Sequence, residues 1–185
     1  MPPSQKDNSM TVSSDLRVDA VPTIGAPRQA SPDLLRSVFR RHAAGVAVVT
    51  ARGERPVGFT ATSLNSVAAD PPLISFGVGT SSSSWPVLAE AEHIGVHILG
   101  EHQQDLAATF ARSGADRFGE GTRWSEGPEG VPVLDDVLAW LVCRVVARVP
   151  AGDHRIVIAQ AVAGDPDGVG RPLLYHHGRF NALRD

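Results

Sequence analysis

Five consecutive hydroxyl residues are the first feature of this sequence that could do chemistry. They are Thr80, Ser81, Ser82, Ser83 and Ser84, and they directly precede residues 85–90, which have the composition of a short helix. Hydroxyls and backbone N–H groups in such a place can form an anion-binding nest. Hydroxyl-rich loops are also often simply solvated, so composition alone leaves both interpretations open.

The seven histidines raise the question of a metal site. His93 and His97 are four residues apart, as on a metal-binding helix. However, the apolar alternation over residues 94–98 predicts a strand, along which four residues span about 13 Å, too far for two ligands of one ion. We expect His176 and His177 to point to opposite faces of the chain. The sequence therefore predicts no metal site.

Several well-known catalytic motifs are missing. Gly77-Val78-Gly79 runs on into the hydroxyl residues instead of completing the Gly-x-Gly-x-x-Gly pattern, which disfavours a Rossmann dinucleotide site. The sequence has no Walker A lysine and no Gly-x-Ser-x-Gly turn, so it also lacks the motifs of phosphoryl transfer and of α/β-hydrolases.

Composition narrows the class of protein further. The 185 residues are 42% hydrophobic and 20% charged, which is enough for one packed core without disulfides. A net charge of −3 makes nucleic acid an unexpected partner. The single cysteine, Cys143, fits a reducing cytoplasm. No signal-peptide pattern and no apolar run of about 18 residues is present, so we expect no membrane segment.

The pattern of residue types predicts one domain behind a tail. Residues 1–30 have the composition of a disordered arm, or of a segment that becomes ordered over a partner subunit. The domain spans residues 31–185. It should begin with a helix that has Ser31 as its N-cap and Pro32 at its first position, and that ends near Gly45.

The rest of the chain has mainly the pattern of strands joined by turns. We predict a hairpin from residues 46–50 and 57–60, a polar loop up to residues 71–72, and short helices over 85–90 and 104–111. Residues 112–132 should form a long surface loop. Residues 137–149 should form a long strand, with Arg144 and Arg148 on one face, and residues 152–153 should turn it back. Further strands are predicted over residues 73–78, 94–99, 155–159 and 173–175. These features favour a mainly β, antiparallel barrel.

Six stretches in one order resemble the short-chain flavin reductase family, the split-barrel reductase components of two-component flavin-dependent monooxygenases. The resemblance covers roughly residues 33–183. It is carried by residues 45–50, 58–63, 66–72, 110–111 with 116–118, 152–154, and 172–175 with Gly178. It implies an antiparallel split β-barrel that binds FMN.

The resemblance also implies roles for individual residues. The isoalloxazine and ribityl chain would lie against a segment of small and polar residues: Phe59, Thr60, Ala61, Thr62, Ser63, Ser66 and Val67. Residues 80–84 would hold the flavin phosphate, with Arg117 as a candidate cation. Phe110 and Phe118 would pack near the flavin or the partner subunit, although core burial explains them almost as well.

The nicotinamide side of the implied site depends on Gly152, Asp153 and His154. His154 is similar to the family histidine that meets the nicotinamide, where an imidazole can donate to the carboxamide or orient the hydride transfer. Asp153 could hold the turn. Two positions depart from the family pattern: Ala159 stands where relatives commonly have glycine, and Phe180 stands where many have tyrosine. A phenyl ring can pack there but cannot donate a hydrogen bond.

The function implied is hydride transfer from NADH, or from NADPH, to FMN or FAD by an NAD(P)H:flavin oxidoreductase. The resemblance further implies a cytoplasmic homodimer that supplies reduced flavin to a separate monooxygenase. One alternative is a split-barrel sensor or carrier that keeps a flavin or haem without nicotinamide turnover. A second is an oxidase of the pyridoxamine-phosphate type, which the absence of Lys and Arg from residues 58–72 disfavours.

Overall fold

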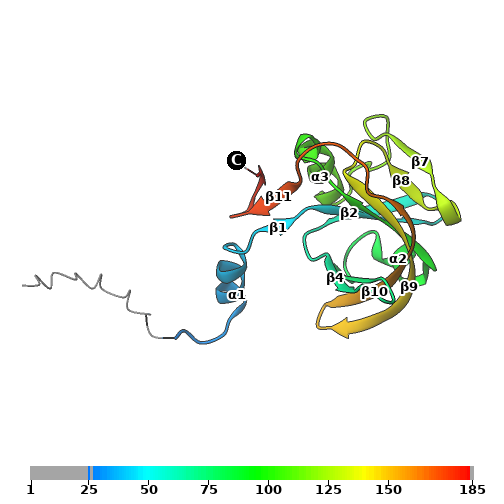
Figure 1. The fold of residues 1–185 in the computed structure, drawn as a ribbon. Coiled ribbons are helices and arrows are strands. Elements are labelled where there is room, and N and C mark those ends of the chain that lie inside the picture. Colours follow the sequence, from blue (N-terminus) through cyan, green and yellow to red (C-terminus); the bar gives the residue numbers. More distant parts are fainter. Residues whose placement is uncertain (1–24, 26, 184–185) are drawn as a thin grey trace, which may run out of the picture.

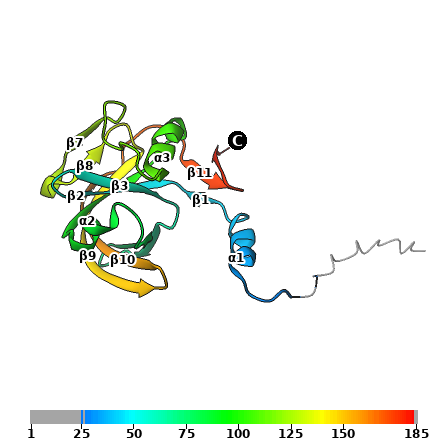
Figure 2. The ribbon, with the colours of Figure 1, turned by 180° about the vertical axis from the view of Figure 1, so that it is seen from behind.

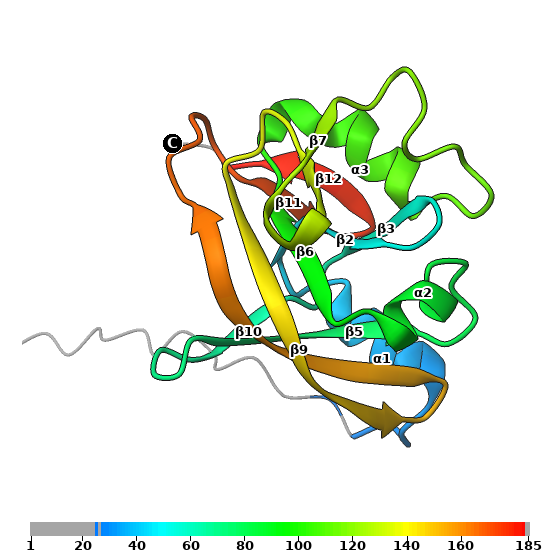
Figure 3. The ribbon, with the colours of Figure 1, turned by 90° about the vertical axis from the view of Figure 1, so that its right-hand side faces the viewer.

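A seven-stranded antiparallel sheet curls around the main core of the molecule (Figures 1 and 3). The computed structural model describes residue 25 and residues 27–183. The strand order is β3-β2-β6-β9-β10-β5-β4, so β3 and β4 are edge strands that do not pair, and residues 62–64 connect them. The sheet is an antiparallel split barrel, as predicted. Its strands are β2 (Ala47–Arg52), β3 (Pro56–Ala61), β4 (Asn65–Ala68), β5 (Leu73–Gly79), β6 (His93–Ile98), β9 (Ala139–Ala151) and β10 (His154–Asp165).

Two smaller sheets and a few short helices complete the described residues. One sheet contains β1 (Ala44–Gly45), β11 (Leu173–His176) and β12 (Arg179–Ala182), and the other contains β7 (Trp124–Glu126) and β8 (Pro132–Leu134). The helices are α1 (Pro32–Phe39), α2 (Trp85–Glu90), α3 (Gln104–Ala111), and the 3₁₀ turns η1 (Glu101–Gln103) and η2 (Pro128–Gly130). None of the helices in the part of the chain that the structure describes is long and apolar enough to cross a membrane.

The two faces of β2 explain its continuous apolar sequence. Val49 and Ala51 belong to the core inside the barrel, together with Phe76 of β5. Val48, with Val46 just before the strand, packs into a second core under α3. Because both faces are covered, residues 47–51 are all buried, with β-branched side chains at Val48, Val49 and Thr50.

Helix α1 stands away from the barrel (Figures 1 and 2). As predicted, Ser31 caps it, accepting a 3.1 Å hydrogen bond from the Leu34 N–H. It ends at Phe39 rather than near Gly45, because the backbone of β1 is already paired with β11. None of its residues is buried, and Leu35, Val38 and Phe39 are exposed, Phe39 at 61%.

A β-bulge corrects the prediction that Arg144 and Arg148 share a face. Ala159 pairs with Val145 and Ile158 with Ala147, so Val146 is an extra residue that reverses the alternation of β9. Arg148 consequently lies on the inner side, where its Nε donates to the Leu88 carbonyl at 3.0 Å and its guanidinium also binds the Ala91 carbonyl. Arg144 is exposed and binds Gln160 at 3.0 Å.

Loops hold most of the remaining differences from prediction. The polar loop before residues 71–72 contains β4, and the long loop of residues 112–132 contains β7 and η2. A strand after His176, β12, was not predicted. His177 has a φ of +52°, which places its ring perpendicular to that of His176 at 4.2 Å between centroids, so the expectation of opposite faces was wrong. The predicted arm, residues 1–30, lies outside the described residues except for residues 25 and 27–30.

Candidate functional site

The outer face of β5 carries a strip without side chains. Phe76 and Val78 point into the core, so Gly77 and Gly79 lie on the opposite face. At Gly77 an added Cβ would contact only Ser63 Oγ at 3.6 Å, and at Gly79 its nearest neighbour would be His154 Nε2, also at 3.6 Å. This glycine strip therefore offers a flat, accessible backbone surface against which a planar group can lie.

His154 is fixed at one end of the glycine strip. It is the first residue of β10 and pairs with Gly79. Its Nδ1 lies 2.7 Å from Asp153 Oδ1, and the hydrogen bond and the charge of His154 lower the pKa of Asp153. Since the ionised carboxylate can only accept, Nδ1 donates, and Nε2 faces Gly79. The turn before it needs Gly152 because φ there is +61°.

The hydroxyl run is joined to this turn. The N–H and hydroxyl of Thr80 both donate to the Asp153 carbonyl, at 2.9 and 3.0 Å. A Cβ added to Gly79 would lie 3.8 Å from Ser81 Oγ and 3.6 Å from His154 Nε2, so the Ser81 hydroxyl lies on the same side of Gly79 as the imidazole. The Ser82 N–H donates to the Gly79 carbonyl. The structure therefore brings the hydroxyl run, the glycine strip and His154 together.

Arg117 reaches the far end of the hydroxyl run from the long loop. One terminal nitrogen donates to both Ser83 Oγ and Ser84 Oγ at 3.1 Å, and the other donates to the Arg112 carbonyl at 2.9 Å. Its Nε is buried with no hydrogen-bond partner among the described residues, and burial lowers the pKa of the guanidinium. A cation that is held in the described residues by neutral acceptors alone keeps its charge unpaired, which suits an anion.

A cavity of about 540 Å³ adjoins this arginine. Its lining includes a second arginine, Arg55, the carboxylate of Asp116 and the ring of Phe118. We predicted only a hairpin whose strands are residues 46–50 and 57–60, so Arg55, which lies between them, was missed as a potential contributor. Two guanidinium groups against one carboxylate make the cavity favourable for a phosphate.

The segment that connects the two edge strands lies at the other end of the strip. Ser63 Oγ accepts a 2.9 Å hydrogen bond from the Gly77 N–H, and Asn65 Nδ2 donates to the Ser63 carbonyl at 2.9 Å. Thr62 and Ser63 line a further cavity, whereas Ser66 and Val67 lie exposed on β4. These residues remain candidate contacts for a ligand on the strip.

Other predicted contacts of this segment point elsewhere. Ala61 is buried, and Phe59 packs on Phe76 with 6.0 Å between ring centroids, so both face the core. The Thr60 hydroxyl donates to the Ala107 carbonyl at 2.6 Å. Ala61 could contact a ligand only through its backbone, whereas Phe59 and Thr60 are partly buried and remain candidate contacts.

The predicted aromatic residues pack edge-to-face in the second core. Phe110 is fully buried, so the core-burial interpretation holds for it, and its ring packs on Phe118 at 5.3 Å between centroids. Phe180 packs on Tyr175 at 5.5 Å and on the second core, and no described contact links it to His154.

The described residues contain no group of three His, Cys, Asp or Glu side chains that could hold a metal ion. His97 is fully buried, and its Nδ1 lies 3.0 Å from the Val48 carbonyl. Burial lowers the pKa of His97 to about 4. This histidine is a neutral core residue.

An open antiparallel barrel with a candidate anion site, a flat strip and an oriented imidazole defines a split-barrel protein whose shape and donors suit a planar, phosphorylated ligand. The family model described as "Flavin reductase like domain" matches residues 39–184. The chain therefore belongs to the flavin reductase family.

Individual relatives are similar over most of their length. A protein of Rhodococcus qingshengii named NADH:FMN oxidoreductase is 42% identical over 183 residues, which cover 94% of this chain and 95% of the relative. The reductase component of a 4-nitrophenol monooxygenase from Rhodococcus opacus is 36% identical, covering 78% and 77%. The structure of the NADH:FAD oxidoreductase SgcE6 of Streptomyces globisporus, in complex with NAD and FAD fragments, has a TM-score of 0.79 at 30% identity, covering 85% and 98%.

Proposed function

We propose that this chain is an NAD(P)H:flavin oxidoreductase that passes a hydride from NADH, or from NADPH, to FMN or FAD. The observation that carries the proposal is the glycine strip between Ser63 and His154, with Arg117 beyond it. The names of the relatives, which include NADH:FMN and NADH:FAD oxidoreductases, support the same reaction.

The residues present fit a flavin. A tricyclic ring needs a flat surface and backbone groups near its heteroatoms, which the glycine strip and the segment at Ser63 provide. A phosphate needs donors and positive charge, and the guanidinium of Arg117, which lines a cavity beside Ser83, is such a group. When bound, flavin supplies the acceptor for the hydride.

The protein's own residues contribute positioning. The imidazole of His154, held by Asp153, would hydrogen-bond to the nicotinamide carboxamide and fix its distance from the strip. The Thr80 contacts keep the turn that carries both residues against β5. Hydride transfer needs no nucleophile or general base from the chain.

We further propose a homodimer with two sites at the subunit interface. Apolar side chains lie uncovered on two surfaces, which a second copy would remove from water. They belong to α1 and to the outer face of β9 and β10, and comprise Leu35, Val38, Phe39, Val146, Val149, Ile156 and Val162. Light scattering on the purified protein tests this assembly, and a monomeric mass at micromolar concentration would contradict it.

The destination of reduced flavin would be a separate flavin-dependent monooxygenase, since a relative is the reductase component of such an enzyme. The cytoplasm is the compartment we expect. There, the fully buried thiol of Cys143, whose pKa burial raises to about 12, would remain reduced and unreactive.

The decisive experiment measures NADH oxidation by the purified protein with and without FMN, FAD or riboflavin. Turnover that depends on added flavin supports the proposal and identifies the preferred flavin, and repeating the assay with NADPH identifies the preferred reductant. Flavin that stays bound without any turnover would instead favour the sensor or carrier function.

A further inference from the structure

The hydroxyl run of residues 80–84 contains one side chain that differs from its neighbours. Four of its hydroxyls take part in hydrogen bonds, those of Thr80, Ser82, Ser83 and Ser84. No hydrogen bond of the Ser81 hydroxyl is found within residues 27–183, and this residue is exposed. Ser83 and Ser84 line the cavity beside Arg117, whereas Ser81 does not. The candidate phosphate site therefore leaves the Ser81 hydroxyl without a role.

Ser81 lies beside His154 at the Gly79 end of the glycine strip. The position that a Cβ of residue 79 would occupy is 3.6 Å from His154 Nε2 and 3.8 Å from Ser81 Oγ. Both groups therefore border the same small space above the backbone of β5. A single polar group of a ligand that lies over Gly79 can reach both of them within hydrogen-bond distance.

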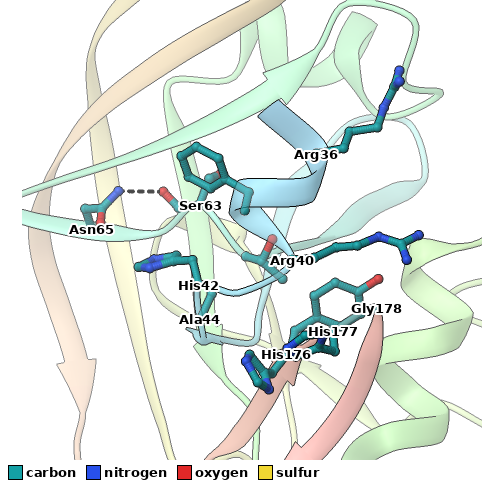
Figure 4. Close-up of a pocket in the computed structure, with 12 residues that line it drawn as sticks. Arg36, Arg40, His42, Ala44, Ser63, Asn65, His176, His177 and Gly178 are labelled. Atoms are coloured by element: carbon teal, nitrogen blue, oxygen red, sulfur yellow. Dashed lines mark hydrogen bonds between the residues drawn. The ribbon is translucent and has the colours of Figure 1, made fainter. Parts of the chain in front are cut away.

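At the Ser63 end of the strip, the polar groups bind to the chain itself. The Ser63 hydroxyl accepts from the Gly77 N–H at 2.9 Å and lies 3.4 Å from the Gly77 carbonyl. The Ser63 carbonyl accepts from Asn65 Nδ2, a hydrogen bond drawn in Figure 4. At the Gly79 end, by contrast, neither Ser81 Oγ nor His154 Nε2 has a hydrogen-bond partner among the described residues. A ligand on the strip therefore finds available side-chain partners at the Gly79 end.

These two available groups have complementary hydrogen-bonding character. Nδ1 of His154 donates to the Asp153 carboxylate, so in the neutral imidazole Nε2 carries a lone pair and accepts. The Ser81 hydroxyl can donate. An acceptor beside a donor matches a primary carboxamide, which presents an NH₂ group and a carbonyl oxygen side by side. A carboxylate has only acceptors, and a methyl ketone offers a partner to the donor alone, so neither matches both groups.

We propose that Ser81 is a specificity-determining residue that donates to the carboxamide oxygen of the nicotinamide, while His154 Nε2 accepts from the carboxamide nitrogen. The inference rests on the proposed function, in which the nicotinamide lies at this end of the strip. Two hydrogen bonds prevent the carboxamide from rotating and so fix the orientation of the nicotinamide ring. It follows that the site prefers a carboxamide on this ring to a carboxylate or an acetyl group.

Equilibrium binding to the full chain, with excess FMN present, tests the inference without turnover. The ligands are three oxidised dinucleotides that differ in one ring substituent. NAD⁺ carries the carboxamide, 3-acetylpyridine adenine dinucleotide carries a methyl ketone, and nicotinic acid adenine dinucleotide carries a carboxylate. We expect wild-type protein to bind NAD⁺ about five- to tenfold more tightly than the acetyl analogue, which lacks one hydrogen bond, and to bind the carboxylate analogue most weakly.

Two variants separate the two hydrogen bonds. Ser81→Ala should weaken the binding of NAD⁺ and of the acetyl analogue by the same factor, about five- to tenfold, because both ligands have the carbonyl oxygen. His154→Ala should abolish the preference for NAD⁺ over the acetyl analogue, which has no N–H to donate. Ser125→Ala is the matched control, since Ser125 is an exposed serine of β7, and it should leave all three dissociation constants unchanged.

Three outcomes overturn the inference. In the first, wild-type protein binds NAD⁺ no more tightly than the carboxylate analogue. In the second, Ser81→Ala binds the dinucleotides as Ser125→Ala does. In the third, Ser81→Ala reduces the preference for FMN over riboflavin instead, which would assign the hydroxyl to the phosphate. A failure of the proposed function alone has a different signature, because NAD⁺ binding would then depend on Ser81 in a protein that does not oxidise NADH with any flavin.

Discussion

The carboxylate of Asp153 and the imidazole of His154 form a hydrogen-bonded pair, with 2.7 Å between Oδ1 and Nδ1. The two residues are neighbours in sequence, yet their side chains meet because Gly152 turns the chain with a positive φ and Thr80 holds the Asp153 carbonyl. The pair determines which imidazole nitrogen faces the glycine strip. Asp153 is thus a positioning residue for His154.

Replacement of His154 by alanine should raise the KM for the nicotinamide substrate much more than the KM for flavin, because we assign the imidazole to one substrate only. Steady-state assays that vary each substrate in turn measure this split. His102→Ala is a suitable control, since His102 is also partly exposed and lies 3.3 Å from a carboxylate, that of Asp136. Equal changes in both KM values would refute the role given to His154.

Replacement of Arg117 by glutamine should reduce the preference for FMN over riboflavin, which lacks the phosphate. Charge-assisted hydrogen bonds predict a decrease of about 10- to 100-fold in the ratio of the two kcat/KM values. Arg123→Gln, which removes an exposed arginine paired with Asp136 at 3.7 Å, should leave that ratio unchanged. An unaltered ratio in the Arg117 variant would mean that the phosphate binds elsewhere.

Arg148 and Arg144 provide a matched pair for stability, since they lie four residues apart on β9 but on opposite faces. Arg148→Met should lower the free energy of unfolding by about 2 kcal/mol, because the carbonyls of Leu88 and Ala91 lose their donor. Arg144→Met should cost less than about 0.5 kcal/mol, as is usual at an exposed site. Urea denaturation compares the two, and similar losses would contradict the inward placement of Arg148.

Burial of His97 predicts a loss of stability in mild acid. Its pKa is lowered from 6.5 to about 4, so the unfolded chain takes up a proton before the folded protein does as the pH falls. Stability should therefore decrease between pH 6.5 and pH 4, and this residue alone should remove about 2 kcal/mol between pH 7 and pH 5. His97→Gln should flatten that part of the stability profile, measured by urea denaturation at both pH values. A profile identical to wild type would exclude His97 as the cause.

Local signals predicted a large part of the fold. The capping residue Ser31, the bounds of α2 and α3, and the hairpin of β2 and β3 depend on neighbours in sequence, and all are present in the structure. The relation of Arg117 to Ser83 and Ser84 was suggested by family resemblance, and the structure places these three side chains in contact. Their role in binding phosphate remains a prediction.

Features that depend on tertiary context were not predictable from residue patterns. The reversal of Arg148 comes from one extra residue, Val146, whose position is determined by pairing with β10. The edge-to-face contact of His176 and His177 involves a positive φ at a non-glycine residue, His177. The glycine strip did leave a signal, since Gly77 and Gly79 alternate with buried residues, but we used that pattern only to exclude a Rossmann motif.

The glycine strip also affects how the site would appear in a mutational survey. The strip would serve a ligand through the empty space beside Gly77 and Gly79, where no side chain stands. An alanine scan works by truncating side chains, so it has nothing to remove at these two positions. Only a substitution by a larger residue tests whether a ligand needs this empty space. Since a new Cβ at Gly79 would meet no atom closer than 3.6 Å, a larger residue could occupy the surface without unfolding the chain, and the protein would remain stable while losing its substrate.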